Sequence, residues 1–403
     1  MRDYESSHPW LTFKVDLSRA PHNLWVLLGE CQSKIEHLAG VPLRPSTAEG
    51  LHKLYLAKGA RATTAIEGNT LSEEEVLAHL DGELELPPSR EYLKQEVANI
   101  VTACNGIRDE LANGECPLCS VDRIKAFNRL VLRNLPLREG IQPGEVSSFT
   151  VGVARYRGAP RQDCEYLLER LCGWLNGEDF APQGELNTAM AIIKAVLAHL
   201  YLAWLHPFGD GNGRTARLVE FDILLSAGVP APAAHLLSNH YNLTREEYYR
   251  QLDRASRSGG DVVPFISYAA QGLRDGLAEQ ISLIRRQQSD VAWRNYVHES
   301  FRDKSGPAQQ RRRHLVLDLS PSTEPVRRSQ LTAISPRVAK AYAGTTSKTL
   351  SRDLNALQEM HLIVKVMVPD QVGGRTFEHV AYKANKELID AFLPFRRHDD
   401  PMD

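Results

Sequence analysis

The sequence has few cysteines, no long uninterrupted apolar run and almost no excess charge. Six cysteines in 403 residues cannot form the framework of a disulfide-stabilised fold, and such usage is typical of a reducing compartment. The most apolar stretch, residues 191–205, contains Lys194 and His199, and the first residues, MRDYE, do not have the order of a secretory signal. We therefore expect a cytoplasmic protein with no membrane partner.

The charge is unevenly distributed, although it sums to only -2. Residues 311–390 carry 13 Lys and Arg against 8 Asp and Glu, so an acidic body precedes a basic segment. A basic end can meet a polyanion such as DNA. The length, with 42% apolar and 24% charged residues, allows two or three globular domains.

Helical periodicity dominates the first 300 residues. Residues 47–66 carry apolar side chains at spacings of three and four, residues 72–75 (SEEE) have the pattern of a capping box, and residues 187–205 form a long apolar helix. Residues 145–159 alternate in polarity instead, which predicts a short β-hairpin. The polar stretch 287–313 contains Ser-Gly-Pro and predicts a linker between domains.

The C-terminal segment has a different pattern. Residues 347–360 predict a helix with leucines on one face, and residues 363–368 and 376–382 flank DQVGG as a hairpin. Residues 346–354 resemble the recognition helix of bacterial winged-helix regulators. We therefore predict a winged helix whose Lys348, Arg352 and 311–313 arginine run contact DNA phosphates, with the 373–375 turn as the wing. The same domain can equally serve dimerisation, giving a homodimer, or target recruitment.

The richest chemistry lies in residues 206–217, HPFGDGNGRTAR, between two predicted helices. The Gly-Asn-Gly turn permits backbone conformations in which N–H groups converge near the positive end of the following helix, and this forms an anion cradle. Arg214 and Arg217 lie three residues apart, so both can grip neighbouring phosphates. Asp210 is suited to Mg²⁺, and His206 can accept a proton near neutral pH. The segment predicts nucleotidyl or phosphoryl transfer to a hydroxyl.

At every defined position this string resembles the HxFx(D/E)GNGRxxR motif of the Fic family, whose members transfer AMP from ATP to Tyr, Thr or Ser of proteins. The resemblance implies a mainly α-helical Fic core with a β-hairpin flap, followed by the winged helix. It implies ATP and a protein target as partners and Mg²⁺ as cofactor. The roles it implies are base for His206, metal ligand for Asp210, and nucleotide binding for Gly211, Asn212, Gly213, Arg214 and Arg217. Family members that phosphorylate instead carry lysine where Gly213 stands, which favours AMP.

An N-terminal segment resembles the family's inhibitory helix. Residues 63–68, TTAIEG, fit its (S/T)xxxE(G/N) signature, and the resemblance implies that Glu67 pairs with Arg217 and blocks productive ATP binding. Independently of the family, Glu67 lies at a helix C-terminus, where a carboxylate is disfavoured by about 0.3–1 kcal/mol unless a cation is near. In some members the same glutamate also supports removal of AMP.

Two further sets of residues follow from the resemblance. Val151, Gly152 and Val153 are expected to form the edge of the flap that docks the target, and the Tyr248–Tyr249 pair is expected to line the nucleotide pocket. Paired tyrosines on a helix are more often core residues, so for this pair the core and the pocket roles both stay open. The expected boundaries are an N-terminal helical region with the inhibitory helix (1–110), a Fic core (111–285), a linker (286–310) and a winged helix (311–395).

The expected function is protein AMP transfer, including self-modification, under autoinhibition by Glu67. The alternative is a DNA-binding regulator whose Fic core senses ATP or modifies only itself. Transfer of a different group, such as UMP or phosphocholine, is a second alternative.

Overall fold

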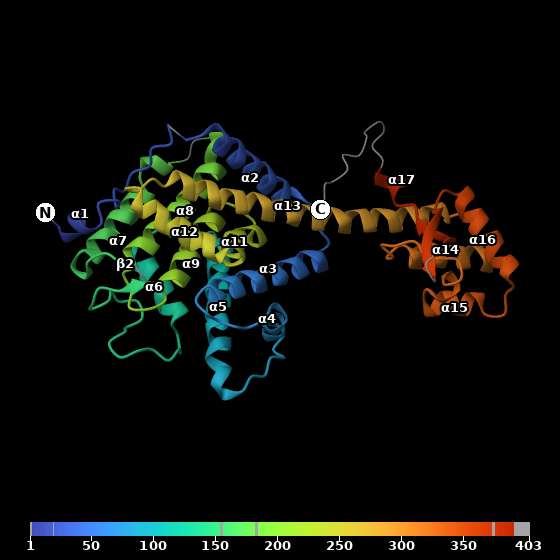
Figure 1. Ribbon diagram of the computed structural model, residues 1–403, viewed down its shortest axis with the longest axis horizontal. Coiled ribbons are helices and arrows are strands. Elements are labelled where there is room, and N and C mark those ends of the chain that lie inside the picture. The colour runs from blue at the N-terminus through green and yellow to red at the C-terminus, as the bar shows by residue number, and fades with distance from the viewer. Residues whose placement is uncertain (1, 19, 154–155, 182–183, 373–374, 391–403) are drawn as a thin grey trace. The chain divides into compact units, whose positions relative to one another are not determined.

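The computed structural model describes all residues except 1, 19, 154–155, 182–183, 373–374 and 391–403, so the last residues of the expected 311–395 domain lie outside it. The chain divides into two compact units, Met1–Ile281 and Ser282–Asp403 (Figure 1). The mostly helical architecture with a small antiparallel sheet agrees with the predicted fold class.

The first unit is built almost wholly from helices. In chain order its elements are α1 (Asp3–Ser7), α2 (His22–Gly40), α3 (Pro45–Ala65), α4 (Glu73–Leu80), η1 (Pro88–Arg90), α5 (Glu91–Ala112), α6 (Val121–Val131), β1 (Gly152–Val153), β2 (Tyr156–Arg157), α7 (Arg161–Leu175), η2 (Glu178–Phe180), η3 (Gly184–Leu186), α8 (Asn187–Leu205), α9 (Asn212–Ser226), α10 (Ala231–Ala234), α11 (Leu236–Leu243), α12 (Arg245–Arg257) and the first part of α13 (Val263–Ser300).

Helix α8 forms the centre of this unit. It is long and apolar enough to cross a membrane, but 83% of its most apolar window is buried against protein, so it serves here as a core helix. It packs against α2, α7 and α9. Helix α8 ends just before the 206–211 loop and α9 begins just after it, so this pair of helices fixes both ends of the loop.

Helix α3 carries the inhibitory signature at its C-terminal end and agrees closely with the predicted 47–66 helix. It packs against α4, α5, α9, α10 and α11. The expected capping box starts α4: Ser72 Oγ accepts from Glu75 N at 3.2 Å, and Glu75 Oε2 accepts from Ser72 N at 2.8 Å. The turn between the two helices therefore has a fixed geometry.

A short hairpin lies within the predicted range 145–159, and its strands β1 and β2 have two residues each. Only Gly152 pairs with Arg157 and Val153 with Tyr156, and Val151 precedes the strand. Residues 145–150 bind the motif loop instead, because Val146 bridges Phe208 and Ser147 N donates to Pro207 O at 2.8 Å. Backbone groups of Val146 and Ser147 thus pair with the motif loop and do not extend the hairpin.

The second unit combines helices with a three-stranded sheet. Its elements are the end of α13, α14 (Pro307–Leu319), β3 (Val326–Arg327), η4 (Leu331–Ala333), α15 (Pro336–Tyr342), α16 (Ser347–Glu359), β4 (Ile363–Val372), β5 (Arg375–Ala384) and α17 (Glu387–Asp390). The sheet order is β3-β5-β4, with both pairs antiparallel. Helices followed by a hairpin are the order that the sequence predicts.

Two details of this unit differ from expectation. The expected 286–310 linker is largely helical, and Trp293, Val297 and Phe301 from it belong to the core of the second unit. Arg311 and Arg312 do not point outward as a phosphate-binding run. They donate to the carboxylate of Asp353 at 2.7 and 2.8 Å, because a buried carboxylate requires counterions. The turn residues 373–374 of the expected wing lie outside the described structure.

Candidate active site

The motif loop begins with an unusual backbone. His206 ends α8 in the left-handed conformation, with φ 48° and ψ 54°, and Gly211 precedes α9 with φ 74°. A left-handed non-glycine residue is strained and is most often found at functional sites. The conformation turns the chain sharply and leaves the imidazole at the wall of a cavity.

Phe208 and Asn212 hold the loop to the core. Phe208 is 1% exposed, and its backbone N–H donates to Asn212 Oδ1 at 2.9 Å while its C=O accepts from Asn212 Nδ2 at 2.6 Å. Both polar atoms of the Asn212 side-chain amide are therefore occupied within the loop. The backbone N–H groups of Asn212 and Gly213, in the first turn of α9, have no intrahelical acceptor and can serve an anion.

A third loop-holding residue, Asn128 of α6, escaped sequence analysis. Its fully buried side chain donates to Asp210 O at 3.0 Å and to Thr215 Oγ1 at 3.2 Å, and accepts from Gly144 N at 2.8 Å. Asn128 thereby links the segment before the flap, at Gly144, to the motif loop and to α9. No spacing along the chain relates it to the motif, so only the packing of α6 against α9 could have identified it.

Glu67 and Arg217 form the expected pair. Arg217 Nη2 donates to Glu67 Oε1 at 2.6 Å and to Thr63 O at 2.9 Å, and the arginine side chain is 1% exposed while the glutamate is 35% exposed. Gly213 permits this approach, because a Cβ there would lie 2.1 Å from Glu67 Oε1. The end of α3 therefore reaches into the anion cradle.

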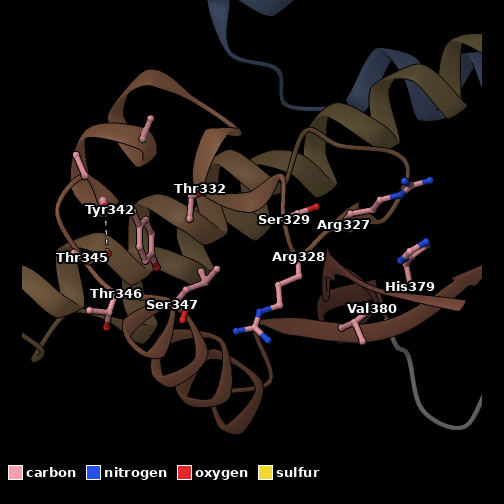
Figure 2. Close-up of a pocket in the computed structure, with 13 residues that line it drawn as sticks. Arg327, Arg328, Ser329, Thr332, Tyr342, Thr345, Thr346, Ser347, His379 and Val380 are labelled. Atoms are coloured by element: carbon pink, nitrogen blue, oxygen red, sulfur yellow. Dashed lines mark hydrogen bonds between the residues drawn. The ribbon is translucent and has the colours of Figure 1, made fainter.

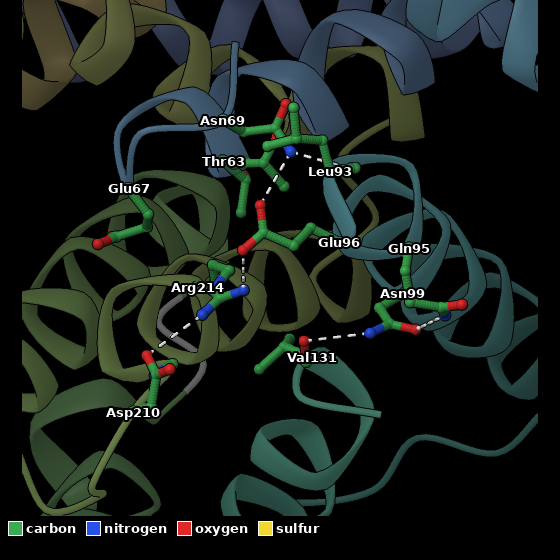
Figure 3. Close-up of polar contacts among 12 residues, drawn as sticks. Thr63, Glu67, Asn69, Leu93, Gln95, Glu96, Asn99, Val131, Asp210 and Arg214 are labelled. Atoms are coloured by element: carbon green, nitrogen blue, oxygen red, sulfur yellow. Dashed lines mark hydrogen bonds and ion pairs between the residues drawn. The ribbon is translucent and has the colours of Figure 1, made fainter. Parts of the chain in front are cut away.

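Arg214 has other partners (Figure 3). Its Nη1 donates to Glu96 Oε1 of α5 at 2.9 Å and its Nη2 to Asp210 Oδ1 at 3.3 Å. Glu96 also accepts from Asn69 Nδ2 at 2.9 Å. Sequence analysis missed Glu96, which lies 118 positions before Arg214.

A cavity of about 630 Å³ is lined by His206 and by the Glu67–Arg217 pair. It is lined by Glu67, Tyr156, Ala203, Trp204, His206, Gly213, Arg217, Tyr248, Tyr249, Leu252, Asp253 and Arg257. The structure thus places both tyrosines at the cavity, as the resemblance implies. Arg214 and Asp210 are not among the lining residues.

Tyr248 is fixed from behind by His199. The phenol and His199 Nε2 are 2.8 Å apart, and His199 Nδ1 lies 3.4 Å from Glu220 Oε2. Glu220 also accepts from Tyr241 OH at 2.8 Å. The buried His199 is therefore a partnered core residue that orients one wall of the cavity.

The electrostatics favour a neutral imidazole. Burial lowers the pKa of His206, although a contact with Ala203 O and the charges of Glu67 and Asp210 act in the opposite direction. His206 Nδ1 lies 3.4 Å from Ala203 O, so a proton on Nδ1 leaves Nε2 as the acceptor. Burial would raise the pKa of Glu67, but Arg217 above all, helped by Arg214 and His206, holds that pKa below its usual value and keeps the carboxylate charged.

The donor set around Asp210 suits a hydrated magnesium ion. The side chain is 47% exposed, and Oδ1 accepts from Gly211 N at 2.5 Å and from Arg214. Within the described ranges no three His, Cys, Asp or Glu gather as a metal site. One carboxylate with phosphate oxygens and waters is the usual manner of Mg²⁺ binding at nucleotides.

The flap lies next to His206. Gly158 N donates to Val151 O at 2.9 Å, and a Cβ at Gly158 would lie 2.7 Å from His206 Cβ. Gly152 is exposed, whereas the side chain of Val153 lies outside the described residues. The flap edge therefore starts close to the position where a reacting hydroxyl would lie.

Comparison with known proteins gives a consistent result. The model of the Fic/DOC family matches residues 118–224. Protein adenylyltransferase fic-1 of Caenorhabditis briggsae is 31% identical over 233 residues, which are 57% of this chain and 42% of that protein. Protein adenylyltransferase Fic of Nematostella vectensis is 29% identical over 209 residues, 52% of this chain and 45% of the relative. The chain thus spans less than half the length of these curated relatives.

Solved structures share the fold. A Fic family protein from Desulfovibrio desulfuricans G20 aligns over 90% of this chain and 96% of its own, with a TM-score of 0.54 and 21% identity. Fic-1 (residues 134–508) from Caenorhabditis elegans aligns over 66% of this chain and 73% of its own, with a TM-score of 0.53 and 26% identity. The motif loop lies within the region that matches the Fic/DOC family, residues 118–224, and the curated relatives and solved structures support a Fic family protein.

Proposed function

We propose that this protein transfers AMP from ATP to a hydroxyl of a protein. The observation that carries the proposal is one cavity of about 630 Å³ that brings together a half-buried imidazole, a buried guanidinium and the start of a helix. Transfer from a triphosphate requires a proton acceptor for the nucleophile and positive groups for the phosphates in one place. Relatives named protein adenylyltransferase support the same reaction.

In the proposed mechanism, His206 Nε2 accepts the proton of a Tyr, Thr or Ser hydroxyl as its oxygen forms a bond to the α-phosphorus. The bond from the α-phosphorus to the bridging oxygen breaks, and pyrophosphate leaves. The N–H groups of Asn212 and Gly213 stabilise the α-phosphate oxygens, while Arg217, which lines the cavity, binds the β- and γ-phosphates. Arg214, which the resemblance assigns to the same role, does not line the cavity and is paired with Glu96 and Asp210. Mg²⁺ held by Asp210 would neutralise charge on the departing phosphates.

We further propose that Glu67 inhibits this reaction. Its carboxylate occupies Arg217 at 2.6 Å and lies against Gly213, where the triphosphate would need room. The protein's own hydroxyls are the first substrates available to the enzyme, so we expect self-modification in the absence of a target.

The decisive experiment is intact-mass measurement of the Glu67→Gly protein after incubation with ATP and Mg²⁺. We expect a mass gain of one adenylyl group, no gain in the Glu67→Gly, His206→Ala double variant, and a small gain in the wild type. An unmodified Glu67→Gly protein, tested both alone and with a lysate of potential targets, would refute AMP transfer. A gain from UTP or CDP-choline but not from ATP would replace AMP by that group.

A second candidate, a DNA-binding regulator, is favoured by the second unit. A cavity of about 820 Å³ lies between the start of α16 and the β3–β5 pair and is lined by Arg327, Arg328, His379 and the hydroxyls of Thr345, Thr346 and Ser347, among others (Figure 2). Arginines beside hydroxyls at a helix start are suited to backbone phosphates.

Fluorescence anisotropy with duplex DNA fragments at several salt concentrations would test this candidate. Removing one phosphate contact by Arg328→Ala should reduce the slope of log affinity against log salt by about one, whereas Arg302→Ala, at an exposed position in the turn after α13, should leave it unchanged. Equal slopes for both variants would exclude this surface as the DNA site.

A further inference from the structure

Each of the two motif arginines is paired with one carboxylate from outside the motif, but the two pairs differ in position. Glu67 reaches Arg217 from the cavity, which it lines, and its side chain is 35% exposed. Glu96 reaches Arg214 from the opposite side, does not line the cavity, and is 16% exposed. Glu67 occupies space that a nucleotide needs, whereas Glu96 does not.

Glu96 is held on both of its oxygens. Oε1 accepts from Arg214 at 2.9 Å and Oε2 accepts from Asn69 Nδ2 at 2.9 Å (Figure 3). Asn69 is itself 7% exposed, donates also to Leu93 O at 2.9 Å, and accepts from Leu71 N at 3.0 Å. Such complete pairing fixes the carboxylate in one orientation.

The same guanidinium also contacts Asp210, at 3.3 Å. Arg214 is 5% exposed, so its charge must be balanced by carboxylates from the protein. With Glu96 present, Asp210 is only the second and more distant of two counterions. Without Glu96, Asp210 would be the one carboxylate left in contact with Arg214, and a cation would have to compete with a buried arginine for it.

We propose that Glu96 is a positioning residue of this site: it balances and orients Arg214, and thereby keeps Asp210 available to the divalent cation that accompanies the triphosphate. The proposal rests on the proposed AMP transfer for the identity of the nucleotide. It assigns to α5, outside the 206–217 motif, a part in nucleotide binding.

The test uses calorimetric titration of the full-length Glu67→Gly protein, with and without Glu96→Gln. ADP binding is titrated at a series of Mg²⁺ concentrations, and AMP binding is titrated in EDTA. For Glu96→Gln we expect the Mg²⁺ concentration that gives half of the ADP enhancement to rise about 10- to 100-fold, as for other residues that orient a metal ligand. AMP binding should stay unchanged. Glu96→Asp, which retains the charge, should show a smaller rise and serves as the test variant if Glu96→Gln does not fold.

The matched control is Glu91→Gln, which removes an exposed charge from the same helix. A Mg²⁺ requirement in Glu96→Gln equal to that of Glu91→Gln, or lower, would overturn the proposal. An equal loss of AMP and ADP binding would also overturn it, because it would mean that Glu96 only supports the fold. If the Glu67→Gly parent binds ADP and gains an adenylyl group while Glu96→Gln behaves as the control, this inference fails alone. If the parent does neither, the proposed function fails.

Discussion

Replacing Glu67 by glycine should activate the protein and destabilise it at the same time. The substitution removes the 2.6 Å charge-assisted bond to Arg217 and opens the space beside Gly213. A mutation that activates an enzyme by repairing its fold raises activity and stability together. A gain in activity combined with a loss of stability is therefore specific to release of an inhibitory contact.

The expected increase in activity follows from the Glu67–Arg217 bond, which ATP no longer has to break in order to bind. A charge-assisted hydrogen bond contributes about 1.5–3 kcal/mol net, and because 35% of the Glu67 side chain is exposed we take about 1.5–2 kcal/mol. At about 1.4 kcal/mol per tenfold, kcat/KM for ATP should rise about 10- to 30-fold.

The expected loss of stability comes from Arg217. After the substitution this 1% exposed guanidinium keeps Thr63 O but has no carboxylate, which should lower the free energy of unfolding by about 1.5–3 kcal/mol. For a unit of this size that corresponds to a decrease in Tm of several degrees, about 2–4 °C per kcal/mol. ATP supplies phosphates to Arg217, so saturating ATP should restore most of the loss.

Radiolabel incorporation from α-labelled ATP gives the rate, and differential scanning fluorimetry with and without ATP gives the stability. Glu67→Gln, which keeps the size but loses the charge, should activate less than Glu67→Gly. Glu49→Gln, an exposed charge removed from the same helix, should match the wild type in both assays. Equal labelling by Glu67→Gly and the wild type, or a stability gain in Glu67→Gly, would refute the inhibitory role.

His206→Ala in the Glu67→Gly background should abolish label transfer while ATP still protects against thermal unfolding. Because burial lowers the pKa of His206 and Glu67 partly opposes that shift, the acid limb of the pH–rate profile should lie below about pH 6.5, and lower in Glu67→Gly than in the wild type. Asn128→Ala leaves the Gly144 N–H and the Asp210 C=O without their buried partner, so denaturant titration should show a loss of about 2–4 kcal/mol.

The parts of the site that sequence analysis predicted are those encoded by short-range spacing. His206, Gly211 and Arg217 belong to one loop and one helix start, and Glu67 is recognisable because a carboxylate at a helix C-terminus requires a cation. Its partner, Arg217, came from the family resemblance and not from spacing. The structure brings the two together at 2.6 Å.

The parts that were missed depend on how separate helices pack. Glu96 and Asn128 are ordinary polar residues within amphipathic helices, and nothing near them in the sequence distinguishes them from solvated positions. Their importance comes from the approach of α5 and α6 to α9. The arginine run at 311–313 illustrates the opposite error: it suggested an exposed basic surface, but the buried Asp353 draws Arg311 and Arg312 inward.

The connection between the two carboxylates limits how the proposed inhibition by Glu67 would be relieved. Asn69, which holds Glu96, follows Glu67 by two residues, and its N–H donates to Thr64 O at 3.2 Å at the end of α3. Rotation of the Glu67 side chain toward solvent would free Arg217 and leave the contacts of Asn69 intact. Unwinding the end of α3 would free Arg217 but would also release Glu96, and Arg214 would then draw on Asp210. An activating signal that preserves metal binding must therefore act on the Glu67 side chain or shift α3 as a whole, without melting its last turn.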